Sequence, residues 1–185
     1  MFPKPTEVKI LAQEIYNWNV HVGWWDDPDR CIFTTFQLIS TEIAEATEGE
    51  RKNLMDDHLP HRKMGEVELA DAVIRLLDLA GKFGWEYNQN FPAHAWCRNA
   101  KRNSTIGKLH LGLNAALVDL AEEYSLNSTG PQLGTWYSVL LSSLCIVAFH
   151  QHYDLWAAVD EKIEYNKTRA DHKRENRAKE NGKKF

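Results

Sequence analysis

Apolar residues recur at helical spacing along almost the whole chain, and this periodicity most constrains the fold. No stretch shows the sustained alternation of apolar and polar residues that is typical of a half-buried strand. The 185 residues are enough for one domain with a substantial core. The sequence therefore predicts an all-α protein, a multi-helix bundle in one domain spanning residues 1–185.

Capping residues and breakers place the expected helices. Gly84 is a stop signal, Pro92 favours the first turn of a short helix, and Ser104 and Asp154 can cap the helices that follow them. The helices are expected after Thr6, at 34–51, 64–83, 92–102, 104–124 and 135–152, and after Asp154.

Four carboxylates lie on two neighbouring predicted helices, Glu42 and Glu45 on one and Glu68 and Asp71 on the next. Residues three apart share a helix face, so each pair can offer oxygen ligands to the same cation. Glu42 also interrupts the apolar stripe of its helix, and a carboxylate that faces a core is costly unless a cation or hydrogen bonds compensate it. We expect all four to bind Mg²⁺, with Mn²⁺ able to substitute.

A plainer interpretation of the same acids stays open. They could form two solvated helix faces, with Arg51, Lys52 and Arg75 as local partners.

Composition excludes several classes of protein. A net charge of −4 argues against binding to nucleic-acid polymers, which requires a basic surface. The three cysteines include no CxxC pair and are expected to be inert core thiols in a reducing compartment. The longest apolar stretch, 139–149, is too short to span a membrane, and the N-terminus lacks a signal peptide. We therefore expect a cytoplasmic protein without a membrane partner.

The end of the chain is basic, in contrast to the acidic stretch that carries the four carboxylates. Lys162, Asn166 and Arg169 follow one another at i, i+4 and i+7, so they share a helix face and can hold phosphate oxygens. An acidic metal-binding region and a cationic C-terminal region suit a metal-bound polyphosphate. Alternatively, Lys162, Asn166 and Arg169 form only an exposed charged face of their helix.

A weak internal repeat runs through the chain. Shifting the sequence by 67 residues places 98–102 over 165–169, so that Asn99 meets Asn166 and Arg102 meets Arg169. The repeat divides the chain into a metal-binding half (1–103), a degenerate second half (104–178) and a basic tail (179–185). Coincidence between two helix-turn-helix units explains so short a match equally well. Phosphate contacts from 99–102 remain an alternative to contacts from 162–169.

Glu42-Ile43-Ala44-Glu45 and Glu68-Leu69-Ala70-Asp71 resemble the ExxE and ExxD motifs of the all-α nucleoside triphosphate pyrophosphatases, the MazG-like and dimeric dUTPase group. The neighbouring sequences are similar to versions from tailed phages, from about Trp18 to Gly84 and again after Asp154. The stretch 85–153 departs from a compact member of the group.

The resemblance implies a Mg²⁺-dependent hydrolysis of a nucleoside triphosphate to a monophosphate and pyrophosphate. (d)GTP, dCTP and dUTP are the candidate substrates, and the host cytoplasm is the expected location of a phage-encoded enzyme. The four carboxylates would be the catalytic metal ligands, and Lys162, Asn166 and Arg169 would bind phosphates. Trp24 or Trp25 would stack on the base while the other packs in the core or an interface. The wide apolar faces of such helix pairs predict a homo-oligomer, a dimer or tetramer.

Three other functions compete with this one. A di-iron carboxylate protein is disfavoured because no acid is followed three residues later by His. A non-catalytic helical interaction module and a phosphoribosyl-ATP pyrophosphatase-like enzyme remain alternatives.

Overall fold

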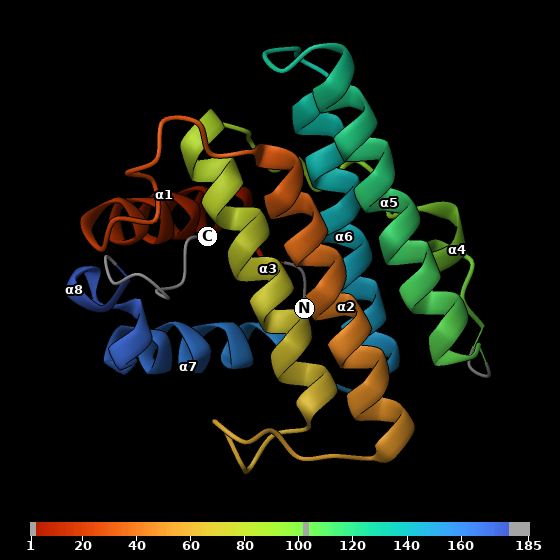
Figure 1. Cartoon of the computed structure of the whole chain (residues 1–185). Helices are drawn as coiled ribbons and strands as arrows, with labels where there is room; N and C mark the ends of the chain where they lie inside the picture. The colour runs from red at the N-terminus through yellow and green to blue at the C-terminus, as the bar shows by residue number, and fades with distance from the viewer. Residues whose placement is uncertain (1–2, 102–103, 178–185) are drawn as a thin grey trace.

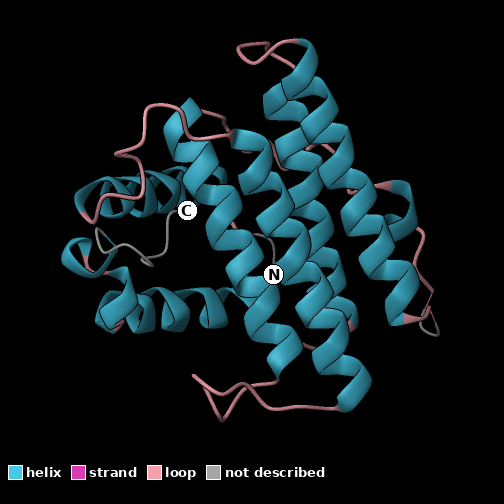
Figure 2. Cartoon of the chain, viewed as in Figure 1, coloured by secondary structure: helices cyan, strands magenta, loops and turns pink. Residues whose placement is uncertain are grey.

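The protein is built from helices joined by loops, as the computed structural model of residues 3–101 and 104–177 shows (Figures 1 and 2). Within these ranges there is no strand, only an isolated antiparallel bridge between Met55 and Lys63. The elements are α1 (Pro5–His21), α2 (Ile32–Lys52), α3 (Met64–Phe83), α4 (Ala95–Arg98), α5 (Ile106–Leu126), α6 (Leu133–His150), α7 (Leu155–Thr168), the 3₁₀ turn η1 (Ala170–His172) and α8 (Arg174–Arg177). The predicted all-α class is confirmed.

Four long helices, α2, α3, α5 and α6, run side by side, and α1 and α7 lie across one side of them (Figure 1). Helix α3 packs against α1, α2, α6 and α7, whereas α5 packs against α2 and α6. The short α4 covers the α5–α6 side, away from α1 and α7. Helix α3 is therefore the central element of the fold.

The sequence of α3 suits its central position. Leu69, Val73, Leu76 and Leu77 are fully buried and form the apolar stripe expected from the helical spacing. Small residues such as Ala70 and Ala72 lie on other faces and are also fully buried, because four helices surround α3. The helix ends at Gly84, whose φ of +70° favours glycine.

Helices α1 and α3 approach each other closely at Gly81. A Cβ at this position would collide with the backbone carbonyl of Ala12 and would lie 2.6 Å from the Cβ of Tyr16. Gly81 therefore allows α1 to pack directly against the C-terminal half of α3.

Helix α6 is long and apolar enough to cross a membrane by length and composition, the only such helix in the described ranges. However, 67% of the 18-residue window is buried inside the protein. Its serines make interior contacts, since Ser138 Oγ accepts the N–H of Asn88 at 3.0 Å and Ser143 Oγ accepts that of His94 at 2.9 Å. These features are those of a core helix.

Several local expectations were wrong. The helix expected from Pro92 is only the short α4, and the cap of α5 is Thr105 rather than Ser104. Asp154 precedes α7 as expected but makes no side-chain cap; its N–H instead donates to Glu66 Oε1 at 2.8 Å. Cys31 is exposed, unlike the other two cysteines.

The internal repeat stays a prediction. Helix pairs α2–α3 and α5–α6 are both long packed pairs, which either duplication or coincidence can produce. The 67-residue shift places Glu68 over Thr135 and Asp71 over Ser138. Thr135 and Ser138 lie near the start of α6. The predicted basic tail (179–185) and Arg102 lie outside the described residues.

Replacing Gly81 by Ala should destabilise the protein by about 1 to 3 kcal/mol, because the added methyl group forces α1 away from α3. Gly107→Ala is the matched control, since a Cβ there meets nothing within 4 Å. The free energy of unfolding of Gly107→Ala should rise by about 0.5 kcal/mol, because Ala has a higher helix propensity than Gly. Free energies of unfolding from urea titrations test both, and equal effects of the two substitutions would contradict the close approach.

Candidate functional site

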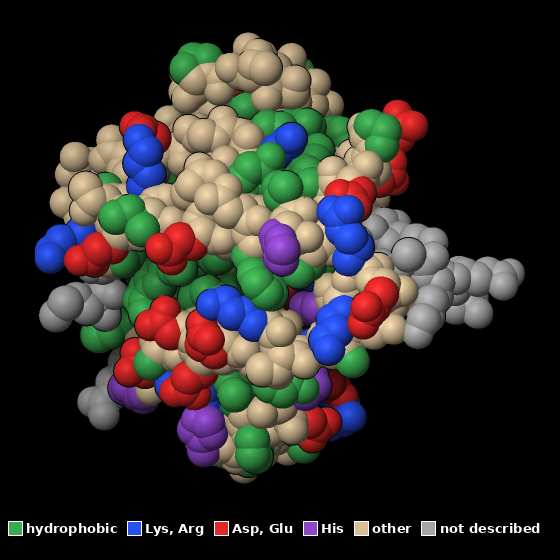
Figure 3. Space-filling model, turned by 90° about the vertical axis from the view of Figure 1, so that its left-hand side faces the viewer, with side chains coloured by type: hydrophobic (Ala, Val, Ile, Leu, Met, Phe, Trp, Pro, Cys, Tyr) green, Lys and Arg blue, Asp and Glu red, His purple; other side chains and the backbone are tan. Residues whose placement is uncertain are grey.

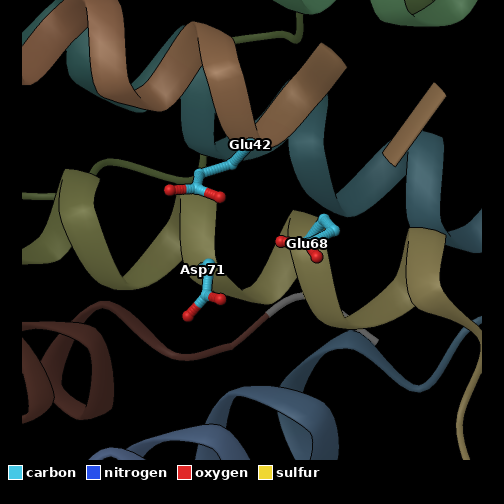
Figure 4. A group of neighbouring side chains, drawn as sticks. All are labelled: Glu42, Glu68 and Asp71. Carbon is cyan, nitrogen blue, oxygen red and sulfur yellow. The ribbon is translucent and has the colours of Figure 1, made fainter. Parts of the chain in front are cut away.

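Three of the four predicted carboxylates meet between α2 and α3. Glu42, Glu68 and Asp71 can each offer one oxygen, and these oxygens lie within 4.8 Å of one another. Glu42 reaches from α2 toward α3, and Asp71 lies on the side of α3 that faces α7 (Figure 4). The helix spacing accounts for the Glu68–Asp71 pair, and the packing of α2 on α3 adds Glu42.

Burial gives this carboxylate triad an unusual electrostatic state. Glu42 and Glu68 are only 7% and 8% exposed, so neither belongs to a solvated helix face. Burial raises the pKa of Glu68 to about 8, with further contributions from Asp71 and Glu42. Burial also raises the pKa of Glu42, against the opposing effect of Arg75.

Two basic side chains compensate the triad. Arg75 Nε donates to Glu42 Oε1 at 2.6 Å, and Lys162 Nζ lies 2.9 Å from Asp71 Oδ2. Arg75 comes from the next turns of α3 itself, whereas Lys162 comes from α7. Each cation therefore joins a different pair of helices through the acids.

Glu45, the fourth predicted ligand, is exposed and is not part of the triad. It is nevertheless close enough that its charge helps to raise the pKa values of Glu42 and Glu68. Its predicted role as a ligand stays a prediction.

A second ion-pair network fixes α7 beside the triad. Arg62 donates to Glu161 on α7 at 2.8 and 3.0 Å and to Glu66 on α3 at 2.9 Å. Arg62 lowers the pKa of Glu161 to about 2, with help from His61. Because Glu161 precedes Lys162 on α7, this network helps to hold Lys162 against α3.

A pocket of about 170 Å³ lies next to the triad, bounded by α1, α3, α7 and the residues that follow α7. Asp71 is the member of the triad that lines it. Figure 3 views the molecule from the α1 and α7 side, and apolar side chains gather in the middle of this face with charged side chains around them. The other lining residues are Leu11, Glu14, Ile15, Trp18, Asn19, Trp24, Arg30, Thr35, Ile74, Arg75, Asp78, Ile163, Asn166, Lys167, Arg169 and His172.

The two adjacent tryptophans have different environments. Trp24 lines the pocket. Trp25 packs inward, where its Nε1 donates to Asp78 at 3.0 Å and the Arg30 guanidinium lies 4.1 Å from its ring centroid. Of the two, only Trp24 is therefore accessible from this pocket.

The three predicted phosphate-binding residues differ in accessibility. Lys162 is 2% exposed, whereas Asn166 and Arg169 line the pocket. Asn166 Oδ1 is buried without a hydrogen-bond partner among the described residues, and Arg169 pairs with Asp171 at 2.7 Å. Of the alternative phosphate-binding residues, Asn99 ends α4 on the α5–α6 side of the fold.

Sequence reasoning missed Trp18, Asn19, Asp78 and His172 as lining residues. Trp18 lies on the same face of α1 as Leu11, and the sequence did not distinguish a pocket face from a core face. His172 reaches the pocket because the chain after α7 returns to the α1–α2 loop, where the rings of His172 and Trp24 are 5.4 Å apart. No local signal in the sequence reveals that return.

A comparison with protein-family models, curated proteins and solved structures finds no match to this chain.

Replacing Glu68 by Gln should stabilise the protein in EDTA at pH 9 by about 2 kcal/mol. The folded state raises the pKa of Glu68 from 4.5 to about 8, so the folded state favours the protonated carboxyl. The stability that this preference gives is fully present below pH 4.5 and is lost as the pH rises through 8. The difference between the variant and the wild type should therefore shrink toward low pH. Urea titrations between pH 4.5 and pH 9 measure it.

Glu45→Gln is the control, because it removes an exposed carboxylate from the neighbourhood of the triad. It should change the free energy of unfolding by less than about 0.5 kcal/mol. A Glu68→Gln effect that does not vary with pH would contradict the raised pKa.

Proposed function

We propose that the protein is a Mg²⁺-dependent nucleoside triphosphate pyrophosphohydrolase that releases a nucleoside monophosphate and pyrophosphate. The observation that carries the proposal is the position of the carboxylate triad and its partner Lys162 beside a pocket that Asp71, Asn166, Arg169 and Trp24 line. One acid of the triad, two candidate phosphate-binding groups and an aromatic side chain thus border one space.

The donor set fits magnesium. Three carboxylates offer only oxygen atoms, which Mg²⁺ prefers, and no histidine or cysteine of the described residues joins the group. Glu42, Glu68 and Asp71 would hold the ion, with Glu45 nearby as a further carboxylate. When bound, Mg²⁺ would lower the pKa of water and neutralise charge on the phosphates.

The remaining residues have roles that their positions support. Arg169 and Asn166 bind phosphate oxygens, since an Arg guanidinium and an amide N–H₂ are both donors at the pocket wall. Trp24 and Trp18 offer aromatic surface to the base. One of the glutamates takes the proton from the attacking water, which requires its ionised form.

Burial of the acids supports the enzyme over a non-catalytic helical module, because a module that used only a charged face would leave its carboxylates in water. The phosphoribosyl-ATP pyrophosphatase-like alternative uses the same metal and phosphate groups. A panel of dGTP, GTP, dCTP, dUTP and phosphoribosyl-ATP, with products identified, separates the substrates.

Asp71→Asn should lower triphosphate hydrolysis at least about a hundredfold while the helical content stays the same, because it removes one of the clustered oxygen anions. Glu48→Gln is the matched control: Glu48 is on α2 but pairs with Arg51 at 2.7 Å and lies outside the triad. Pyrophosphate release and far-UV circular dichroism measure both effects. Wild-type turnover in Asp71→Asn would refute the proposal.

Arg169→Ala should lower kcat/KM about ten- to a hundredfold through loss of a charge-assisted contact worth about 1.5 to 3 kcal/mol, with metal affinity nearly unchanged. Arg98→Ala, on α4, should leave kcat/KM unaltered. Steady-state kinetics with a fixed excess of Mg²⁺ test the pair. A silent Arg169→Ala together with this loss in Arg102→Ala would move the phosphate site to the region of 99–102.

A further inference from the structure

Lys162 is a buried lysine in the wall of the candidate site. It is 2% exposed, and its ammonium group lies 2.9 Å from Asp71 Oδ2. By contrast, the other lysine of α7, Lys167, is exposed and pairs with Glu164 on its own helix. A buried charge is costly unless it is paired, so Lys162 needs Asp71.

The groups that face Lys162 are almost all acidic. Asp71 and Glu68 on α3 and Asp56 in the α2–α3 loop act on its charge, and the Tyr165 ring centroid lies 5.9 Å away. Asp56 is itself buried and accepts two backbone N–H groups of its own loop. Burial lowers the pKa of Lys162, but the three acids together raise it above its usual value.

The carboxylate of Asp71 can therefore interact with two different cations. It holds the ammonium group of Lys162, and it also offers an oxygen within 4.8 Å of those of Glu42 and Glu68. A divalent cation bound by the triad would lie against the ammonium group, and like charges repel strongly where water is scarce.

We propose that Lys162 is the internal counter-ion of the triad, which competes with a divalent cation for Asp71 and turns to the triphosphate when the metal binds. The competition itself needs only the triad and Lys162. The second step rests on the proposed function.

An acceptor for the displaced ammonium group is already in place. Asn166 lies one helical turn beyond Lys162, and its Oδ1 is buried without a partner among the described residues. Side chains at i and i+4 can meet on a helix. Lys162 can therefore leave Asp71 without losing every polar partner, and Asn166 guides it toward the pocket.

Lys162→Met keeps the length of the side chain and removes its charge. If Lys162 competes with the metal, the variant should bind Mn²⁺ about tenfold more tightly than the wild type, as the electron paramagnetic resonance signal of free Mn²⁺ reports. Lys167→Met is the matched control: Lys167 is on the same helix and lines the same pocket, but it pairs with Glu164 and not with the triad, so its loss should change the Mn²⁺ affinity less than about twofold. Hydrolysis by Lys162→Met should nevertheless fall, since the phosphates lose a cation.

The outcomes separate the two proposals. Unchanged or weaker Mn²⁺ affinity in folded Lys162→Met overturns the competition, even if the wild-type protein cleaves triphosphates. Tighter affinity in a protein that cleaves none supports the competition and removes the proposed activity. Failure of the wild type to bind Mn²⁺ overturns both.

A measurement on the wild-type protein covers the case in which Lys162→Met does not fold. Acetylation of Lys162 by an amine-reactive ester, quantified by peptide mass spectrometry, should be slow in EDTA because the group is buried and paired. Saturating Mg²⁺ should accelerate it several-fold, with Lys108 on α5 as the internal reference. An unchanged ratio would show that Lys162 stays on Asp71, and would overturn the proposal.

Discussion

The close packing of three carboxylates between α2, α3 and α7, two of them buried and Asp71 half-buried, is the constraint on which the rest of the structure depends. Clustered acids in an apolar environment repel one another and lose their hydration, so positive groups must reach them. Arg75 meets Glu42 from α3 itself, but Asp71 is met by Lys162, which is 91 residues further along the chain. The charge of Asp71 thus ties α7 to α3, and Arg62 adds a second tie through Glu161.

The position of α7 in turn creates the pocket. Helix α1 crosses α3 where Gly81 allows a close approach, and α7 crosses it where Lys162 meets Asp71. The two helices therefore leave a space beside α3 with apolar surface from α1 and polar groups from α7. The chain after α7 closes one side of this space, since Arg174 pairs with Asp26 in the α1–α2 loop at 2.9 Å. The ion pair between Lys162 and Asp71 that holds α7 against α3 thus also brings the triad close to the polar side chains of α7.

The sequence predicted what depends on local periodicity and failed where distant segments meet. Helix α3 was predicted with its observed bounds because apolar spacing and Gly84 both mark it, and the burial of Glu42 followed from its place in the apolar stripe. Asp154 was a reasonable cap by residue type, yet its N–H satisfies Glu66 on another helix. The burial of Lys162 was equally unpredictable from sequence, because a lysine among charged residues near the end of a chain is usually solvated, whereas here α3 covers it. Propensities describe a residue and its neighbours in the chain, not the partner that burial imposes on it.

The energetics of the triad favour a function over a purely structural role. A buried ion pair generally stabilises a fold no better than apolar side chains of the same volume do, so stability alone gives little reason to place three acids here. Glu68 illustrates the cost: burial and its acidic neighbours raise its pKa to about 8, so that keeping it ionised above that pH opposes folding. Two basic groups offset part of this cost, but no basic group of the described residues lies within 4.0 Å of the Glu68 carboxylate. When Glu68 ionises, its carboxylate carries a charge that a divalent cation would neutralise, and this imbalance is the strongest physical reason to look for a metal there.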